Sequence, residues 1–180
     1  MRVFLDLDGV LVNFLGSALR RNNIRAPDPW PMGVWDMFDA IKVADQIAFW
    51  RAFDDEDFWA HLDWMPKGRR ILNLLEATLG EDNICLLTSP TYNPGCHNGK
   101  MRWIREHMPN YRRKTLIGAC KHFCAHPGSL LIDDSPENIE KFKVHGGCGI
   151  LIKTLWNGHG EDIDTVQELS SDLRKIIEGI

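Results

Sequence analysis

The sequence has no long apolar run and no excess of basic residues. None of its apolar stretches approaches the roughly 20 residues that a membrane-spanning helix needs. Its 21 Lys and Arg residues are outnumbered by 25 Asp and Glu residues, so the formal net charge at pH 7 is −4. A chain without a general positive field is poorly suited to hold nucleic acid. We therefore expect no membrane partner and no strong nucleic-acid footprint.

Cysteine is sparse and present in an odd number, 5 in 180 residues. That number fits reduced thiols in the cytosol better than a disulfide framework. Asp6 follows the starting Met too closely for a secretion signal, so we expect a cytoplasmic protein. A zinc site stays open as an alternative, although the spacing of its candidate ligands matches no common closed zinc site. These candidates are Cys96, His97, Cys120, His122, Cys124 and His126.

What the sequence does contain is typical of one α/β domain. A chain of 180 residues, 44% of them hydrophobic, is long enough to bury a core of its own. Five short apolar runs without polar alternation predict strands of a parallel sheet that is covered on both faces. These runs are residues 2–5, 84–87, 115–117, 129–132 and 149–152. We therefore predict a three-layer, Rossmann-like α/β fold with a five-stranded parallel sheet, whose ligands bind at the carboxyl ends of the strands.

Helical patterns separate the predicted strands, and the first connection is unusually long. Apolar spacing and turn residues predict helices over residues 12–22, 67–79, 100–108, 136–144 and 163–177. Between the first two lies a stretch that holds 9 of the 17 aromatic residues. Long structureless loops are uncommon in compact domains, so this stretch should be folded. We predict a catalytic core of residues 1–24 and 66–180, with a small helical cap at residues 25–65.

An acid pair follows the first predicted strand. Asp6 and Asp8 are two residues apart, so an extended backbone places both on one side, and Gly9 permits a sharp turn after them. One carboxylate can attack an electrophile while the other moves a proton. The alternative interpretation is an ordinary solvated strand end with turn-forming residues.

Polar residues also follow the second and fourth predicted strands. Thr88 and Ser89 offer hydroxyls to a phosphate, although an ordinary turn is the favoured interpretation of this motif taken alone. Asp133 and Asp134 supply hard oxygen ligands that suit Mg²⁺, while a helix cap next to Pro136 is the simpler interpretation. A lysine would neutralise a bound phosphate. Three lysines are candidates for this role: Lys121, Lys100 and Lys114.

The order of these motifs resembles the haloacid dehalogenase superfamily, in its phosphatase branch. Asp8 points to phosphotransfer, since dehalogenase members lack this second acid. The chain is similar to the 5'(3')-deoxyribonucleotidase family in four segments and in the aromatic pairs 49–50 and 58–59. These segments are FLDLDGVL at residues 4–11, TSP at 88–90, KMRW at 100–103 and LIDD at 131–134.

The resemblance implies a role for each matching residue. Asp6 would be the nucleophile that forms an aspartyl-phosphate, and Asp8 the general acid and base. Mg²⁺ would be held by Asp6, by the Asp8 backbone carbonyl and by Asp133, with Asp134 close by. Thr88, Ser89 and Lys121 would bind phosphate. Independently of the resemblance, one or two flat aromatic rings of the cap could stack on a nucleobase, while most of them are expected to form the cap's own small core. The candidates for contact with the substrate are Phe49, Trp50, Trp59 and Trp64.

The leading hypothesis is an Mg²⁺-dependent phosphatase that acts on nucleoside monophosphates, with deoxyribonucleoside 5'- or 3'-monophosphates as substrates. A polynucleotide 3'-phosphatase is the first alternative, because a local run of positive charge offers a channel for a strand. This run comprises Arg102, Arg105, Arg112, Arg113 and Lys114. A non-catalytic binding module is the second alternative, and a homodimer is left open.

Overall fold

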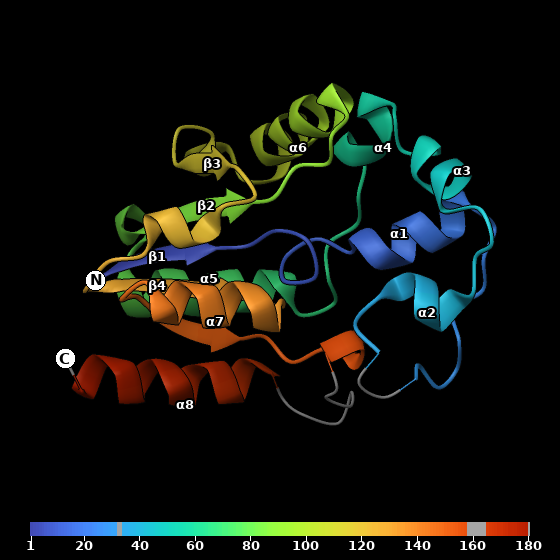
Figure 1. Ribbon diagram of the computed structural model, residues 1–180. Helices are drawn as coiled ribbons and strands as arrows, with labels where there is room; N and C mark the ends of the chain where they lie inside the picture. Colours follow the sequence, from blue (N-terminus) through green and yellow to red (C-terminus); the bar gives the residue numbers. More distant parts are fainter. Residues whose placement is uncertain (32–33, 158–164, 180) are drawn as a thin grey trace.

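The computed structural model describes residues 1–31, 34–157 and 165–179, and its centre is a parallel sheet (Figure 1). Five strands pair in the order β3-β2-β1-β4-β5, and every pair is parallel. The strands are β1 (Arg2–Leu5), β2 (Ile84–Thr88), β3 (Thr115–Ile117), β4 (Ser129–Asp133) and β5 (Cys148–Leu151). The predicted five-stranded α/β sheet is therefore confirmed.

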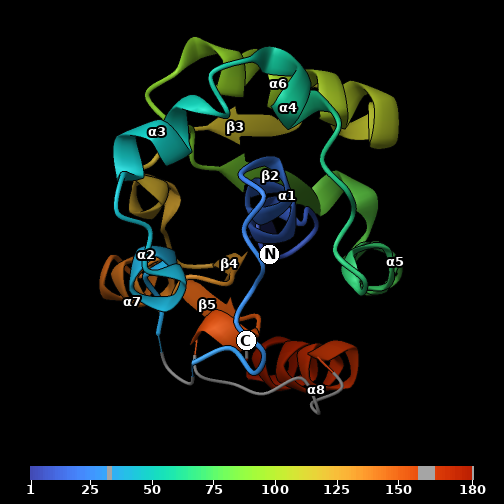
Figure 2. The same ribbon diagram turned by 90° about the vertical axis from the view of Figure 1, so that its right-hand side faces the viewer.

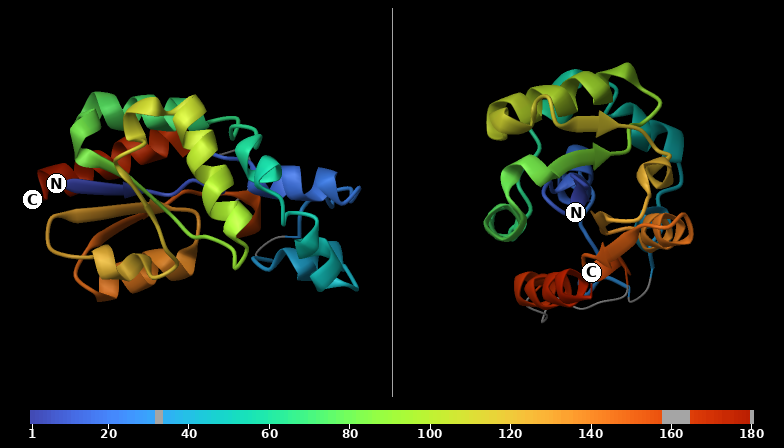
Figure 3. Two further views of the ribbon diagram at one scale, coloured as in Figure 1. Left: turned by 90° about the horizontal axis from the view of Figure 1, so that it is seen from above. Right: turned by 90° about the vertical axis from the view of Figure 1, so that its left-hand side faces the viewer.

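Helices cover both faces of the sheet. The longer ones are α1 (Phe14–Arg21), α5 (Gly68–Leu79), α6 (Pro94–His107), α7 (Pro136–Val144) and α8 (Thr165–Glu178). α5 and α8 lie on one side of the sheet, and α7 lies on the other (Figures 2 and 3). A large buried cluster joins the sheet to α5, α6 and α8, while a smaller one of Phe4, Leu87, Leu131, Ile139 and Phe142 lies beneath α7. This is the three-layer arrangement that the apolar strands predict.

Two predicted helices differ from the observed ones at their starts. α1 begins at Phe14 because the Asn13 side chain accepts a hydrogen bond from Gly16 N. α6 begins at Pro94 rather than at residue 100, because Asn93 caps it in the same way. Glycines in its first turns conceal that start in the sequence. The predicted helix 163–177 is observed from Thr165 onward, and its first two residues lie outside the described ones.

The segment predicted to be a cap, residues 25–65, contains three short helices, each begun by an aspartate. They are α2 (Met37–Ile41), α3 (Gln46–Arg51) and α4 (Glu56–Ala60). Asp36, Asp45 and Asp55 accept hydrogen bonds from the first-turn amides of these helices, which satisfies donors that a helix start leaves free. Figure 1 shows α1, α2 and α3 beyond the carboxyl ends of the strands. The cap is therefore positioned over the edge where ligands are expected.

Helix α1 packs with the cap through its first residue. The Phe14 ring stacks on Trp59, with centroids 5.2 Å apart and planes at 4°, and it also stacks on Trp50 at 6.0 Å. At the other end of the helix, Arg21 pairs with Asp55 at 2.9 Å. We therefore propose that the cap includes α1 and begins near Phe14, earlier than the predicted boundary at residue 25.

Replacing Trp59 by alanine is expected to destabilise the protein strongly. Its side chain is 2% exposed, and its indole N–H donates to the Phe53 carbonyl oxygen at 2.8 Å. Removing such a ring leaves a cavity and an unpaired carbonyl group, so the free energy of unfolding should fall by about 3–5 kcal/mol. Urea denaturation measures this change. The exposed Tyr92→Ala variant is the control, with an expected change of at most about 0.5 kcal/mol. A Trp59→Ala loss as small as the control's would contradict the packing role.

Among the helices that the structure describes, none is long and apolar enough to cross a membrane.

Candidate active site

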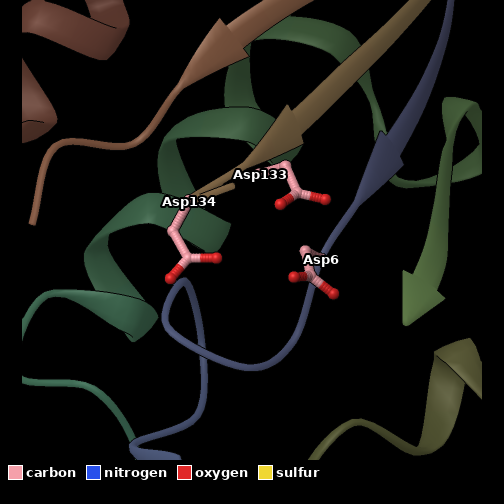
Figure 4. Close-up of side chains that lie close together, drawn as sticks. All are labelled: Asp6, Asp133 and Asp134. Atoms are coloured by element: carbon pink, nitrogen blue, oxygen red, sulfur yellow. The ribbon is translucent and has the colours of Figure 1, made fainter. Parts of the chain in front are cut away.

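Parallel pairing brings the two predicted acid pairs to one edge of the sheet. Leu5 of β1 is in register with Ile132 of β4, and the Asp6 amide donates to the Ile132 carbonyl oxygen at 3.0 Å. The residues that follow, Asp6 and Asp133, are therefore neighbours. Figure 4 shows the side chains of Asp6, Asp133 and Asp134 at the ends of β1 and β4. The sequence prediction that these acids meet agrees with their placement.

Gly9 makes the turn after β1 possible. Its φ angle is +77°, a conformation that side chains disfavour. A Cβ atom at this position would lie 2.1 Å from Asp134 Oδ2, so only glycine leaves room for that carboxylate. The loop after β1 and the end of β4 therefore fit together at this point.

Three carboxylates form a buried cluster around one lysine. One oxygen each from Asp6, Asp133 and Asp134 lies within 4.8 Å of the others, and all three residues are buried. Lys121 Nζ lies 2.7 Å from Asp6 Oδ1 and 2.7 Å from Asp133 Oδ2, and its side chain is 2% exposed. Of the three lysine candidates, Lys121 is thus the one inside the acid cluster.

Burial dominates the electrostatics of this cluster. The pKa of Asp6 is raised to about 7, mainly by burial; Lys121 opposes this shift, and Asp133 and Asp8 add to it. Burial and the two neighbouring carboxylates also raise the pKa of Asp134 well above its usual value. For Lys121, burial favours a lower pKa, but Asp6 and Asp133 outweigh it and raise the pKa above its ordinary value. Three acids with one cation thus leave a surplus of negative charge.

This surplus fits a divalent cation. Clustered carboxylate oxygens are the donors that Mg²⁺ prefers, and a bound cation would relieve the repulsion that the raised pKa values of Asp6 and Asp134 express. The sequence places the backbone carbonyl of Asp8, not its carboxylate, at the metal, and that carboxylate lies outside the cluster and pairs with Lys100. The residues present therefore suit Mg²⁺, with Asp6, Asp133 and Asp134 as the side-chain ligands.

Lys100 connects the other predicted residues. Its Nζ donates to Asp8 Oδ2 at 2.5 Å, to Thr88 Oγ1 at 2.8 Å and to the Ser89 carbonyl oxygen at 2.6 Å. Its side chain is 3% exposed, and α6 carries it to the end of β2. The sequence offers Lys100 as a rival of Lys121 and as the first residue of the family-like segment 100–103, without pairing it with Asp8. The structure assigns the two lysines to different acids, Lys121 to Asp6 and Lys100 to Asp8.

Other residues, which sequence patterns did not mark as contacts of the acids, donate hydrogen bonds to Asp133 and Asp134. Asn138 Nδ2 donates to both oxygens of Asp133, at 3.3 and 3.2 Å, and the Ser135 amide donates to Asp133 Oδ1 at 2.8 Å. The Trp156 indole N–H donates to Asp134 Oδ2 at 2.7 Å. Ser135 also caps α7, so the capping interpretation of this segment and the acid-site interpretation hold together. No periodicity in the sequence marks Trp156.

A cavity of about 570 Å³ lies between the acid edge and the cap, and we call it the active-site cavity. Asp6, Asp8, Asp133, Asp134, Lys121 and Ser89 line its acid edge. Aromatic rings line much of the rest: Phe14, Trp30, Trp35, Phe38, Trp50 and Trp156. The cavity therefore joins a charged end to an aromatic end, which suits a substrate with a phosphate and a ring.

Of the four cap residues predicted to contact substrate, Trp50 alone lines this cavity. Phe49 and Trp59 are each 2% exposed and belong to the hydrophobic core. Trp64 packs on Trp103 at 4.8 Å and under the Arg69 guanidinium. The structure thus gives Phe49, Trp59 and Trp64 packing positions, because a unit as small as the cap needs most of its rings for its own core.

The cysteines and histidines do not gather into a metal site in the part of the chain that the structure describes. There, the acid cluster is the one group of at least three possible metal ligands within reach of each other. All five cysteines are free; Cys96 is buried, whereas Cys120 is exposed. The zinc alternative has no support in this geometry.

The parallel sheet, the acid pair after β1 and the buried lysine beside it define a haloacid dehalogenase-type hydrolase. Within that class, residues 1–177 match the model of one family, described as "5' nucleotidase, deoxy (Pyrimidine), cytosolic type C protein". The chain belongs to this family. The resemblance seen in the motifs is thereby confirmed.

Individual proteins are also similar to this chain. This chain is 26% identical over 163 residues to the mitochondrial 5'(3')-deoxyribonucleotidase of Mus musculus. The match covers 76% of this chain and 66% of the mouse protein, which is just under two thirds of the mouse protein's length.

Among solved structures, a phosphonoacetaldehyde hydrolase-like protein from Oleispira antarctica is 15% identical, with a TM-score of 0.47 and coverage of 97% of this chain and 80% of the other. A magnesium complex of a HAD family enzyme from Bacteroides thetaiotaomicron is 12% identical, with a TM-score of 0.48 and coverage of 92% and 97%.

Proposed function

We propose that the protein is an Mg²⁺-dependent phosphomonoesterase that removes phosphate from deoxyribonucleoside 5'- or 3'-monophosphates. One observation carries this proposal: Asp6, paired with the buried Lys121, lies at the acid end of a cavity whose other end is aromatic. The family to which the chain belongs is described by 5'-nucleotidase activity, which supports the same conclusion.

Asp6 is the nucleophile in this proposal. Its carboxylate oxygen attacks phosphorus, so an O–P bond to Asp6 forms while the bond to the nucleoside oxygen breaks. Asp8 gives a proton to the departing nucleoside oxygen. Asp8 then takes a proton from water, which attacks the aspartyl-phosphate and releases inorganic phosphate and free Asp6. Lys100 Nζ, 2.5 Å from Asp8 Oδ2, holds this carboxylate in place.

The surrounding polar groups hold the phosphate. Lys121 neutralises negative charge on the transferring group, and Thr88 and Ser89 lie at the end of β2 beside it. The Thr88 hydroxyl accepts a hydrogen bond from Lys100 Nζ at 2.8 Å. Mg²⁺ held by Asp6, Asp133 and Asp134, and by the Asp8 backbone carbonyl, would stabilise the negative charge of the phosphoryl oxygens.

Trp50 contacts the nucleobase in this proposal, so Trp50→Ala should raise KM for a nucleotide. Base–aromatic stacking contributes about 1–3 kcal/mol, which corresponds to a roughly 5- to 150-fold higher KM. The KM for a small phosphomonoester without a ring should not change. Steady-state kinetics on both substrates measure the difference.

Ile47→Ala is the matched control for this prediction. Ile47 lies on the same helix α3 and is 68% exposed, but it does not line the active-site cavity. Its KM values should equal those of the wild type. A Trp50→Ala variant whose nucleotide KM is also unchanged would contradict the stacking role.

A screen of phosphomonoesters with Mg²⁺ tests the proposed substrate. We expect release of phosphate from nucleoside 5'- or 3'-monophosphates and much less from sugar phosphates. The comparison also includes a 3'-phosphorylated oligonucleotide. No turnover of any mononucleotide, with strong turnover of a sugar phosphate or of the oligonucleotide, would refute the substrate assignment.

The contacts of the basic run favour the mononucleotide over a polynucleotide end. Arg102 pairs with Glu56 at 2.9 Å and with Asp57 at 2.7 Å, and Lys114 pairs with Glu81 at 2.8 Å. Carboxylates therefore neutralise part of the charge that a strand would need. We also propose a cytoplasmic location, which the word "cytosolic" in the family description supports, although the mouse relative is named mitochondrial.

A further inference from the structure

The turn after β5 contacts the acid cluster at Asp134. This turn, η4 (Leu155–Asn157), places the Trp156 indole N–H 2.7 Å from Asp134 Oδ2. The next residue, Asn157, donates from Nδ2 to the Asp134 carbonyl oxygen at 2.9 Å and to the Ile152 carbonyl oxygen at 2.8 Å. Its Oδ1 accepts from the Thr154 amide at 2.9 Å. Two adjacent residues thus restrain both the side chain and the backbone of Asp134.

The three acids of the cluster are held in different ways. Lys121 contacts Asp6 and Asp133, and Asn138 and the Ser135 amide also donate to Asp133. These donors do not hydrogen-bond to Asp134. Within the residues that the structure describes, the indole of Trp156 is the group that donates a hydrogen bond to its carboxylate. Among hydrogen bonds to this carboxylate, its orientation therefore depends on the contact with Trp156.

Trp156 contributes to the site through this bond more than through packing. The ring lines the active-site cavity on one side and a second cavity of about 360 Å³ on the other, so it is only partly buried. The same oxygen, Asp134 Oδ2, also lies against Gly9, where a Cβ atom would clash with it. The absence of a Cβ at Gly9 leaves room for Oδ2, and the indole N–H holds it there.

We propose that Trp156 is a positioning residue that orients Asp134 as a ligand of the divalent cation. This inference rests on the proposed function, in which Asp134 belongs to the metal site. Groups that hydrogen-bond to a metal ligand fix its geometry, and their loss typically weakens metal binding about 10- to 100-fold. Trp156 has no part in phosphate binding or proton transfer in this account, so its main effect is on the affinity for the cation.

Direct titration with Mn²⁺, a paramagnetic substitute for Mg²⁺, tests this role without substrate or turnover. Free Mn²⁺ is followed by electron paramagnetic resonance in wild type and in Trp156→Phe, which keeps an aromatic ring and removes the N–H. The dissociation constant should rise at least about 10-fold. At saturating metal, KM for the nucleotide should stay within about twofold of wild type, because the phosphate contacts remain.

Trp30→Phe is the matched control for metal affinity. Trp30 lines the same cavity, but its indole donates to the Val34 carbonyl oxygen at 3.1 Å rather than to a carboxylate. Its Mn²⁺ dissociation constant should equal that of wild type. An unchanged constant in Trp156→Phe, or an equal loss in both variants, would overturn the role of Trp156.

Two further outcomes keep this test decisive. If Trp156→Phe does not fold, Trp156→Leu takes its place, because leucine also removes the N–H donor and offers no metal ligand. Its dissociation constant for Mn²⁺ should again rise at least about 10-fold, and an unchanged constant would overturn the proposal. If wild type binds no Mn²⁺, the proposed metal dependence itself is refuted. If wild type binds Mn²⁺ and Trp156→Phe binds it equally well, only the role of Trp156 is refuted.

Discussion

Asp6→Asn is expected to abolish phosphatase activity, with kcat roughly 10⁴- to 10⁶-fold below wild type. The amide has almost the shape of the carboxylate but does not form the aspartyl-phosphate, because its nitrogen and neutral oxygen are poor nucleophiles. Asp6 lies beside Lys121 and lines the active-site cavity. Asp133 also pairs with that lysine, but it is fully buried and both of its oxygens accept hydrogen bonds from Asn138. Steady-state phosphate release at saturating Mg²⁺ measures the loss.

The same variant should remain folded. Burial raises the pKa of Asp6 to about 7, which means that the ionised carboxylate is unfavourable where it lies. Asparagine removes one of three crowded negative charges, and Lys121 keeps its contact with Asp133. We therefore expect a melting temperature at least as high as that of wild type in metal-free buffer.

Asp54→Asn is the matched control for this substitution. Asp54 is exposed and lies outside the active-site cavity, so its exchange should leave activity unchanged. Substantial turnover by a pure, folded Asp6→Asn protein would contradict the assignment of the nucleophile.

Lys121→Met is expected to lower both stability and activity. Methionine has a similar length but no charge, so Asp6 and Asp133 lose their shared cation. Removing one partner of a buried ion pair leaves an uncompensated charge and typically costs about 3–5 kcal/mol. Loss of the contact between Lys121 and the phosphate should also lower kcat, by a factor of about 10²–10³. Urea denaturation without metal measures stability, and phosphate release measures activity.

The exposed pair Lys175–Asp172 provides the matched control. Lys175 lies 2.8 Å from Asp172 in α8, and its side chain is 72% exposed. Lys175→Met should change the free energy of unfolding by less than about 1 kcal/mol, because solvent screens such pairs. Lys121→Met is further expected to regain part of its stability in Mg²⁺, which supplies positive charge to the same carboxylates. A loss no larger than that of Lys175→Met would contradict the central place of Lys121.

The sequence predicts the sheet and the acid edge well because both depend on local patterns. Apolar runs without alternation indicate parallel strands, and parallel strands place their carboxyl ends at one edge. Asp6 and Asp133 follow such runs directly, so their meeting needs no knowledge of side-chain packing. The cap was expected for an equally simple reason, since a long first connection rich in aromatic residues has to fold.

The sequence does not predict which lysine or which ring faces the substrate. Lys121 begins a single 3₁₀ turn, η3 (Lys121–Cys124), which no periodicity in the sequence indicates. Without the family resemblance, Lys100 and Lys114 are rivals of Lys121 for the role of neutralising the phosphate. Trp50 and Phe49 are adjacent on α3, yet one lines the cavity and the other is buried. The rotation of that helix is set by its packing on Phe14 and Phe38, contacts between segments that the sequence separates.

Capture of the phosphorylated enzyme tests the central claim most directly. Protein quenched in acid during turnover of a deoxyribonucleoside monophosphate is treated with borohydride, which reduces an aspartyl-phosphate to homoserine. The tryptic peptide of residues 3–20 contains both Asp6 and Asp8, so its fragment spectrum has to locate the changed residue. We predict homoserine at position 6, and only in the sample that received substrate. Homoserine at position 8, or none at either position during measured turnover, would contradict the mechanism.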